Sequence, residues 1–77
     1  MKWFKTIYPN LRGEVAVRGM SLSDLASVID VSVPAIRRRL IGAKNGGTDF
    51  SVYECWLMCQ YFGKTFEWLF QTERDVA

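Results

Sequence analysis

The feature that most constrains the fold of this chain is a pair of capped helices separated by only three residues. In "SLSDLASVIDVS", Ser21 can accept a hydrogen bond from a backbone N–H three residues on while Asp24 reaches back, a capping box that begins a helix. Asp30 follows that helix and belongs to the few residue types that tolerate a left-handed backbone. Ser32 then offers a second N-cap. Because the connection is so short, we expect the two helices to cross steeply rather than lie antiparallel.

The second of these helices, expected over residues 33–41, carries a basic face. Ile36 and Leu40 lie one turn apart and form the seam that turns toward the core. At about 100° per residue, Arg38 and Pro34 point almost directly away from that seam. The consecutive arginines of this helix are Arg37, Arg38 and Arg39. The pattern predicts that Arg38 faces outward with the other two arginines on either side.

Another helix precedes this pair, and an extended arm precedes that helix. Residues 1–8 are apolar and basic without a helical stripe, so we expect an arm there. Pro9 suits the first turn of a helix in which Leu11 and Val15 share one face. Gly13 inside this helix costs about 1 kcal/mol relative to alanine, a cost that the close approach of another helix would explain.

Two more helices are expected beyond the glycine-rich loop at residues 42–50. Ser51 and Glu54 form a second capping box, and Thr65 caps a short fifth helix before a tail at 71–77. The apolar residues expected to face the core from these helices are Val52, Cys55, Met58, Cys59, Phe62, Phe66, Leu69 and Phe70. Five short helices without a convincing strand predict an all-α fold.

The composition excludes several classes of protein. The 77 residues make one small domain, residues 1–77, and a hydrophobic content of 49% excludes disorder. The chain has no histidine, no phosphate-binding loop and no identifiable base beside a serine, so we expect neither an enzyme nor a cofactor. Two cysteines cannot complete a zinc site, which usually takes four Cys or His ligands. Cys55 and Cys59 are expected to be small buried hydrophobes in a reducing cytosol.

Hydropathy and charge favour a cytoplasmic protein that meets a polyanion. No apolar run approaches the ~20 residues needed to span a bilayer, so we expect a soluble, cytoplasmic protein without a membrane partner. Residues 1–48 carry eight basic and three acidic side chains, a net charge of +5. Residues 49–77 carry two basic and five acidic side chains, a net charge of −3. A polyanion would be attracted to the first part and repelled by the second.

Residues 20–42, "MSLSDLASVIDVSVPAIRRRLIG", resemble the helix-turn-helix of the Cro/repressor-type (XRE-like) family of phage and bacterial transcription regulators. The similarity continues into the flanking helices and covers roughly residues 8–70, which implies the lambda-repressor-like fold with its motif at about residues 21–41. Two positions depart from the family pattern. Leu22 replaces a glutamine that often touches a DNA phosphate, and Asp30 replaces the glycine of the tight turn.

This resemblance implies binding to double-stranded DNA, with the helix at residues 33–41 in the major groove. Arg38 is then best placed to pair bidentately with guanine, and Arg37 is within reach of a base or a phosphate. The small apolar residues that suit thymine methyl groups are Val33, Pro34 and Ala35, beside the cap Ser32. The residues expected to hold the DNA backbone are Arg39, Lys44 and Asn45, with Lys2 and Lys5 of the arm as further candidates.

The expected function is that of a sequence-specific transcriptional regulator, a phage-like repressor or Cro-type protein. One domain of this size contacts a half-site, so operator binding would ordinarily require a homodimer on a pseudo-palindrome. No small-molecule ligand is evident from the sequence. The alternative is a protein-interaction or antitoxin-like module that uses the same fold.

A second group of residues is a candidate dimer or partner surface. Tyr53, Trp56 and Gln60 lie together at i, i+3 and i+7, away from the core-facing stripe, and Trp68 follows on the fifth helix. Exposed aromatic residues on so small a domain indicate a partner surface. The competing interpretation is that the fifth helix or the Trp3–Phe4 arm folds back over them.

Overall fold

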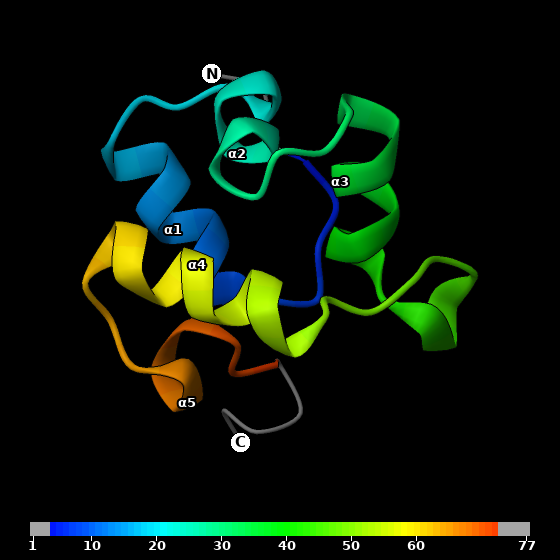
Figure 1. Ribbon diagram of the computed structural model, residues 1–77. Helices are drawn as coiled ribbons and strands as arrows, with labels where there is room; N and C mark the ends of the chain where they lie inside the picture. Colours follow the sequence, from blue (N-terminus) through cyan, green and yellow to red (C-terminus); the bar gives the residue numbers. More distant parts are fainter. Residues whose placement is uncertain (1–3, 73–77) are drawn as a thin grey trace.

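Caps and glycines divide the backbone of residues 4–72, which the computed structural model describes, into short helices (Figure 1). The α-helices are α1 (Pro9–Val17), α2 (Leu22–Val28), α3 (Val33–Ile41), α4 (Val52–Phe62) and α5 (Phe66–Leu69), and η1 (Ala43–Asn45) is one 3-10 turn. No strand occurs between residues 4 and 72. The all-α class expected from the sequence is therefore confirmed.

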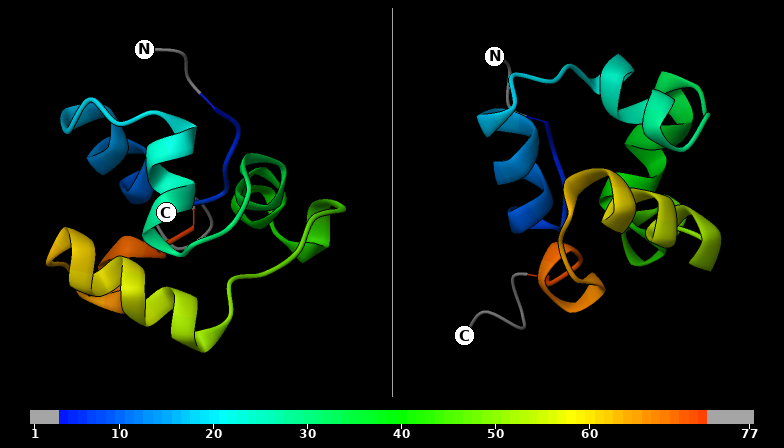
Figure 2. Two further views of the ribbon diagram at one scale, coloured as in Figure 1. Left: turned by 45° about the horizontal axis from the view of Figure 1, so that its top comes forward. Right: turned by 60° about the vertical axis from the view of Figure 1, so that its left-hand side comes forward.

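The helices surround one core (Figures 1 and 2). α2 packs against both α3 and α4, and α5 packs against α1 and α4. η1 and the loop that follows it project beyond α3 at the edge of the molecule, as both figures show. This arrangement leaves one side of α3 and the whole of η1 facing outward.

The connection between α2 and α3 is nearly as tight as the sequence indicates. Asp30 has a φ of 56°, the left-handed conformation that was expected. The backbone N–H of Val31 donates to the carbonyl of Ala26 at 3.1 Å and so closes the end of α2. Ser32 then accepts from the backbone N–H of Ala35 at 3.2 Å and caps the start of α3, so that four residues, 29–32, separate the two helices, one more than expected.

Both expected capping boxes are present. In α2, the backbone N–H of Ser21 donates to Asp24 at 2.9 Å, and that of Asp24 donates to the serine hydroxyl at 3.0 Å. In α4, Ser51 and Glu54 make the same pair of bonds at 3.0 and 3.1 Å. Thr65 caps α5 as predicted. α4 is the longest helix with 11 residues, and no helix among residues 4–72 is long and apolar enough to cross a membrane.

The core takes one or two side chains from every α-helix. Its fully buried members are Leu11, Val15, Leu25, Ile36, Leu40, Met58 and Leu69. Beside them, the rings of Tyr8, Phe50 and Phe70 contact one another with centroids 5.3 to 5.8 Å apart. The expected anchors of α1 and α3 are thus confirmed. Since Ile36 and Leu40 are completely buried, α3 is held to the body along one side only.

Four expectations about local structure are wrong. Val52 and Phe66 were predicted to face the core but are 89% and 57% exposed. Each is the first residue of its helix, and a helical side chain is tilted toward the N-terminus, which here leads away from the core. Part of the loop at residues 42–50 is the regular turn η1. No helix approaches Gly13, because a Cβ added there would meet no atom within 4 Å.

Candidate nucleic-acid interface

The outward side of α3 presents small apolar residues at its start and arginines further along. Pro34 is exposed in the first turn, and Val33 and Ala35 beside it are half-buried. Arg37 and Arg38 follow one turn later and are both exposed. The exposure of Pro34, Arg37 and Arg38 agrees with the outward face predicted from the helical spacing.

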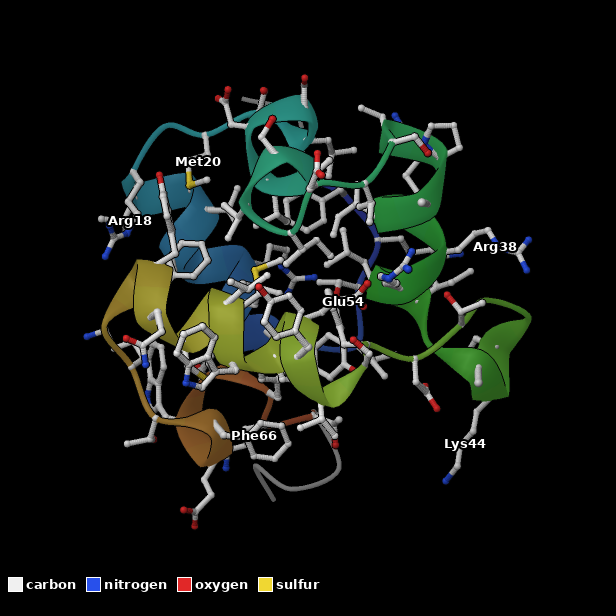
Figure 3. All side chains as sticks on the ribbon, viewed as in Figure 1. Arg18, Met20, Arg38, Lys44, Glu54 and Phe66 are labelled. Atoms are coloured by element: carbon white, nitrogen blue, oxygen red, sulfur yellow. The ribbon has the colours of Figure 1, made fainter. Side chains whose placement is uncertain are left out.

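The two exposed arginines have no ion-pair partner within 4 Å among residues 4–72. Figure 3 shows the side chain of Arg38 extending away from the body of the molecule. Its backbone is nevertheless fixed, because the carbonyl of Arg38 accepts from the backbone N–H of Thr48 at 3.1 Å and of Gly42 at 3.3 Å. A guanidinium on a fixed backbone, with its donors unused by the protein, is suited to bind an anion or a base edge.

Arg39 lies differently from its two neighbours. Its Nε donates to Oε1 of Glu54 at 2.8 Å, and one terminal nitrogen donates to the carbonyl of Ala35 at 3.3 Å. The side chain is only 22% exposed. The sequence pattern predicts that Arg39 holds the DNA backbone, but the guanidinium is turned toward α4 in the structure.

Lys44 and Asn45 belong to η1, beyond the end of α3. Lys44 is exposed and extends on the same side of the molecule as Arg38 (Figure 3). The side-chain amide of Asn45 donates to the carbonyl of Ile41 at 2.9 Å and so caps the last turn of α3. The structure thus adds Lys44 to the outward cations, whereas Asn45 already bonds within the protein.

The arm brings a further cation to this side. The hydroxyl of Thr6 and the backbone N–H of Ile7 donate to the carbonyl of Leu40 at 2.8 and 3.0 Å, so the arm lies along α3. The exposed Lys5 lines a groove of about 180 Å³ together with Arg37 and Arg38. Its charge was noted in the sequence, but its place beside α3 follows from the backbone bonds of the arm. Lys2 lies outside the described residues.

We call the exposed cations Lys5, Arg37, Arg38 and Lys44 the basic surface. Most acidic residues near them are engaged in bonds of their own. Asp49 accepts from the backbone N–H of Ala43 at 3.0 Å, and Glu54 is paired with Arg39. The four exposed cations of the basic surface favour an anionic partner.

The candidate partner residues of α4 and α5 are exposed. Tyr53 and Trp56 are 66% and 55% exposed, and their rings stack with centroids 6.1 Å apart. Gln60 is exposed on the same helix, and Trp68 on α5 is 39% exposed with the Lys64 ammonium 5.2 Å from its ring centroid. Since Tyr53 and Trp56 remain open, α5 does not cover them as the competing interpretation required. The Trp3 part of that interpretation lies outside the described residues.

The two cysteines are both free and partly buried. Burial, with smaller contributions from Cys59 and Glu54, raises the pKa of the Cys55 thiol to about 11, and burial also raises the pKa of Cys59. Both thiols are therefore protonated at neutral pH, which makes them weak nucleophiles.

Among residues 4–72 the structure brings together no group of three or more potential metal ligands of the His, Cys, Asp and Glu types. The basic surface and the exposed aromatic residues offer groups that can contact a partner. No protein-family model, curated protein or solved structure matches the chain.

Proposed function

We propose that this protein is a sequence-specific DNA-binding regulator in which α2 and α3 form a helix-turn-helix and α3 enters the major groove. The observation that carries the proposal is the pair of exposed arginines, Arg37 and Arg38, without ion-pair partners among residues 4–72, on a helix anchored by buried Ile36 and Leu40. The resemblance of residues 20–42 to Cro/repressor-type regulators supports the same conclusion.

The dimensions of α3 suit this role. α3 is an α-helix of nine residues, and an α-helix with its side chains is about 10–12 Å in diameter, which the major groove with its width of about 12 Å admits. Arg38 would pair with a guanine edge, while Pro34 and its half-buried neighbours Val33 and Ala35 would lie against thymine methyl groups. Lys5 lies beside the second half of α3 and Lys44 follows the helix in η1, and both would bind phosphates, which positions the protein without specifying sequence.

A homodimer would bind two half-sites. The molecule measures 30 × 27 × 27 Å, a size that allows two copies in contact to space their α3 helices by about one turn of DNA, or ~34 Å. The exposed residues Tyr53, Trp56, Gln60 and Trp68 are the candidate dimer surface. In this proposal the protein acts in the cytoplasm as a phage-like repressor or Cro-type switch protein.

Selection of bound sites from random duplex DNA tests the proposal, because it reports both sequence preference and half-site spacing. Arg38→Ala should weaken binding to the selected site by about 1–3 kcal/mol, or roughly 5- to 150-fold, and change binding to random DNA little. Lys44→Ala should weaken binding to both duplexes alike, since a phosphate contact carries no sequence information. Equal losses for Arg38→Ala on both duplexes would make it a phosphate contact, and a selection that enriches no sequence would refute the proposal.

The exposure of Tyr53 and Trp56 favours a second candidate function, that of a protein-interaction or antitoxin-like module. The salt dependence of binding affinity distinguishes the two functions. Binding through several phosphates weakens steeply as the salt concentration rises, because counterions are released from the DNA. Binding of a protein partner through stacked aromatic rings responds weakly to salt.

A further inference from the structure

One ion pair joins α3 to the start of α4. Glu54 lies between the two helices, as Figure 3 shows, and its Oε1 is 2.8 Å from Nε of Arg39. The same oxygen accepts the backbone N–H of Ser51 at 3.0 Å, so one carboxylate serves both the capping box and the ion pair. The two side chains are only 22% and 15% exposed. Such a pair is screened little by salt and holds both side chains in one geometry.

The pair acts where α3 is otherwise weakly attached to α4. α3 packs mainly against its neighbours in sequence, α2 and η1. The ion pair instead joins α3 to a residue of α4 that lies fifteen positions further along the chain. The arm holds the last turn of α3 through the carbonyl of Leu40. Arg39 adds an attachment to α4 beside those of the arm and of buried Ile36 and Leu40, and so restricts small rotations of α3 about its axis.

We propose that Arg39 is a positioning residue of the DNA-binding surface, held by Glu54, and that it does not contact phosphate. The inference rests on the proposed function of α3. Side chains of consecutive helical residues point about 100° apart, so a helix whose Arg39 is bound toward α4 must direct Arg38 away from the body. Base recognition needs this direction to hold within about 10–20°. Without the pair, buried Ile36 and Leu40 still hold α3 to the body, but a rotation of more than this range takes Arg38 out of line with a base edge.

Salt dependence separates this role from a phosphate contact. Binding to the selected duplex and to random duplex is measured over a range of salt concentrations for the wild type, Arg39→Gln and Lys44→Gln. For Lys44→Gln, the slope of log K against log salt should fall in magnitude by about 0.9. For Arg39→Gln we expect an unchanged slope, an affinity for the selected site lower by about tenfold or more, and little change on random DNA. A slope that falls for Arg39→Gln as it does for Lys44→Gln would overturn the inference.

Glu54→Gln gives a second test, because its effect on charge and its effect on the position of Arg39 should change DNA affinity in opposite directions. Removing a negative charge from the protein should by itself strengthen binding to a polyanion. The positioning role predicts weaker binding to the selected site instead, because Arg39 loses the carboxylate charge that holds it toward α4. In the Glu54→Gln background, Arg39→Gln should then cause little further loss, since the two changes remove one interaction. Additive losses, or tighter binding by Glu54→Gln, would overturn the inference.

Circular dichroism at the binding temperature confirms that each variant is folded before it is compared. If Arg39→Gln does not fold, Glu54→Gln still tests the inference, because glutamine can accept the backbone N–H of Ser51 and so keep that hydrogen bond of the helix cap. The sign of its effect on affinity for the selected site then decides. Arg38→Ala, measured in parallel, separates this inference from the proposed function. If Arg38→Ala loses specific binding while Arg39→Gln and Glu54→Gln do not, only the positioning role fails. If no duplex is bound at all, both fail.

Discussion

At the scale of single residues, Gly47 shows how closely the loop after η1 follows α3. A Cβ added to Gly47 would collide with the carbonyl oxygen of Arg38 and approach Cγ1 of Ile41 to 2.6 Å. The backbone N–H of Gly47 donates to the carbonyl of Gly42 at 3.0 Å, and the next N–H donates to Arg38. A residue with a side chain does not fit here unless the end of α3 moves.

Gly47→Ala and Gly13→Ala should therefore change stability in opposite directions. Gly47→Ala should lower the free energy of unfolding by about 1–3 kcal/mol, the usual cost of overpacking. Gly13→Ala should raise it by up to about 1 kcal/mol, because Gly13 lies inside α1 and an added Cβ meets nothing within 4 Å. Urea unfolding of both variants measures these changes. Changes of the same sign would contradict the close approach of Gly47 to α3.

At the scale of helices, Glu54 links the start of α4 to α3, and its ionisation stabilises the folded state. Its partial burial pushes the pKa up, but the hydrogen bonds from Arg39 and Ser51 and the charge of Arg39 outweigh this and hold the pKa of Glu54 below its usual value. The carboxylate is thus more acidic in the folded chain than in the unfolded chain. The stabilisation is fully present above the unfolded pKa and is lost as the pH falls through the folded pKa.

Glu54→Gln should accordingly make the stability of the protein less sensitive to acid. We expect the free energy of unfolding to decrease less for this variant than for the wild type between about pH 6 and pH 3, since glutamine does not titrate. Thermal or urea unfolding across this range measures the difference. Asp24, whose pKa the hydrogen bonds with Ser21 also lower, is present in both proteins and is a common background. Parallel curves for the two proteins would contradict a stabilising role for the Glu54 charge.

At the scale of the whole molecule, cations and aromatic residues lie on different elements. The basic surface belongs to the arm, α3 and η1, whereas Tyr53, Trp56 and Trp68 belong to α4 and α5. A protein that binds DNA as a homodimer needs such a separation, because its dimer surface must remain accessible while both copies face the DNA.

Trp56→Ala should weaken self-association without unfolding the domain. Trp56 is 55% exposed and stacks only on another exposed ring, so its loss leaves the core intact. An aromatic anchor of an interface is worth about 2 kcal/mol or more, so the dimer dissociation constant should rise roughly 30-fold. Sedimentation equilibrium measures this change. Val17→Ala is the matched control, because Val17 is an 83% exposed apolar residue on α1.

An unchanged sedimentation profile for Trp56→Ala would remove Trp56 from the dimer surface. An equal effect of Val17→Ala would show that association depends on general hydrophobicity rather than on the stacked rings. A wild type that stays monomeric at every concentration would contradict the homodimer itself.

Much of the helical framework could be predicted because helix starts depend on neighbours in sequence. The capping boxes at Ser21 and Ser51 need only a carboxylate three residues on, and the left-handed Asp30 needs only a short polar side chain at the end of α2. The outward direction of Arg38 follows from its spacing to Ile36 and Leu40. Each of these features is settled within about one helical turn.

The remaining features depend on how the helices pack. Spacing places Arg37 and Arg39 on either side of Arg38, but it does not distinguish them, and only the position of α4 turns Arg39 toward Glu54. Likewise, the place of Lys5 beside α3 follows from the bonds of the arm to Leu40, across more than thirty residues. A hydrophobic pattern gives the direction of a side chain around one helix. The group that a side chain contacts lies on another element, and the two elements come together only when the core forms.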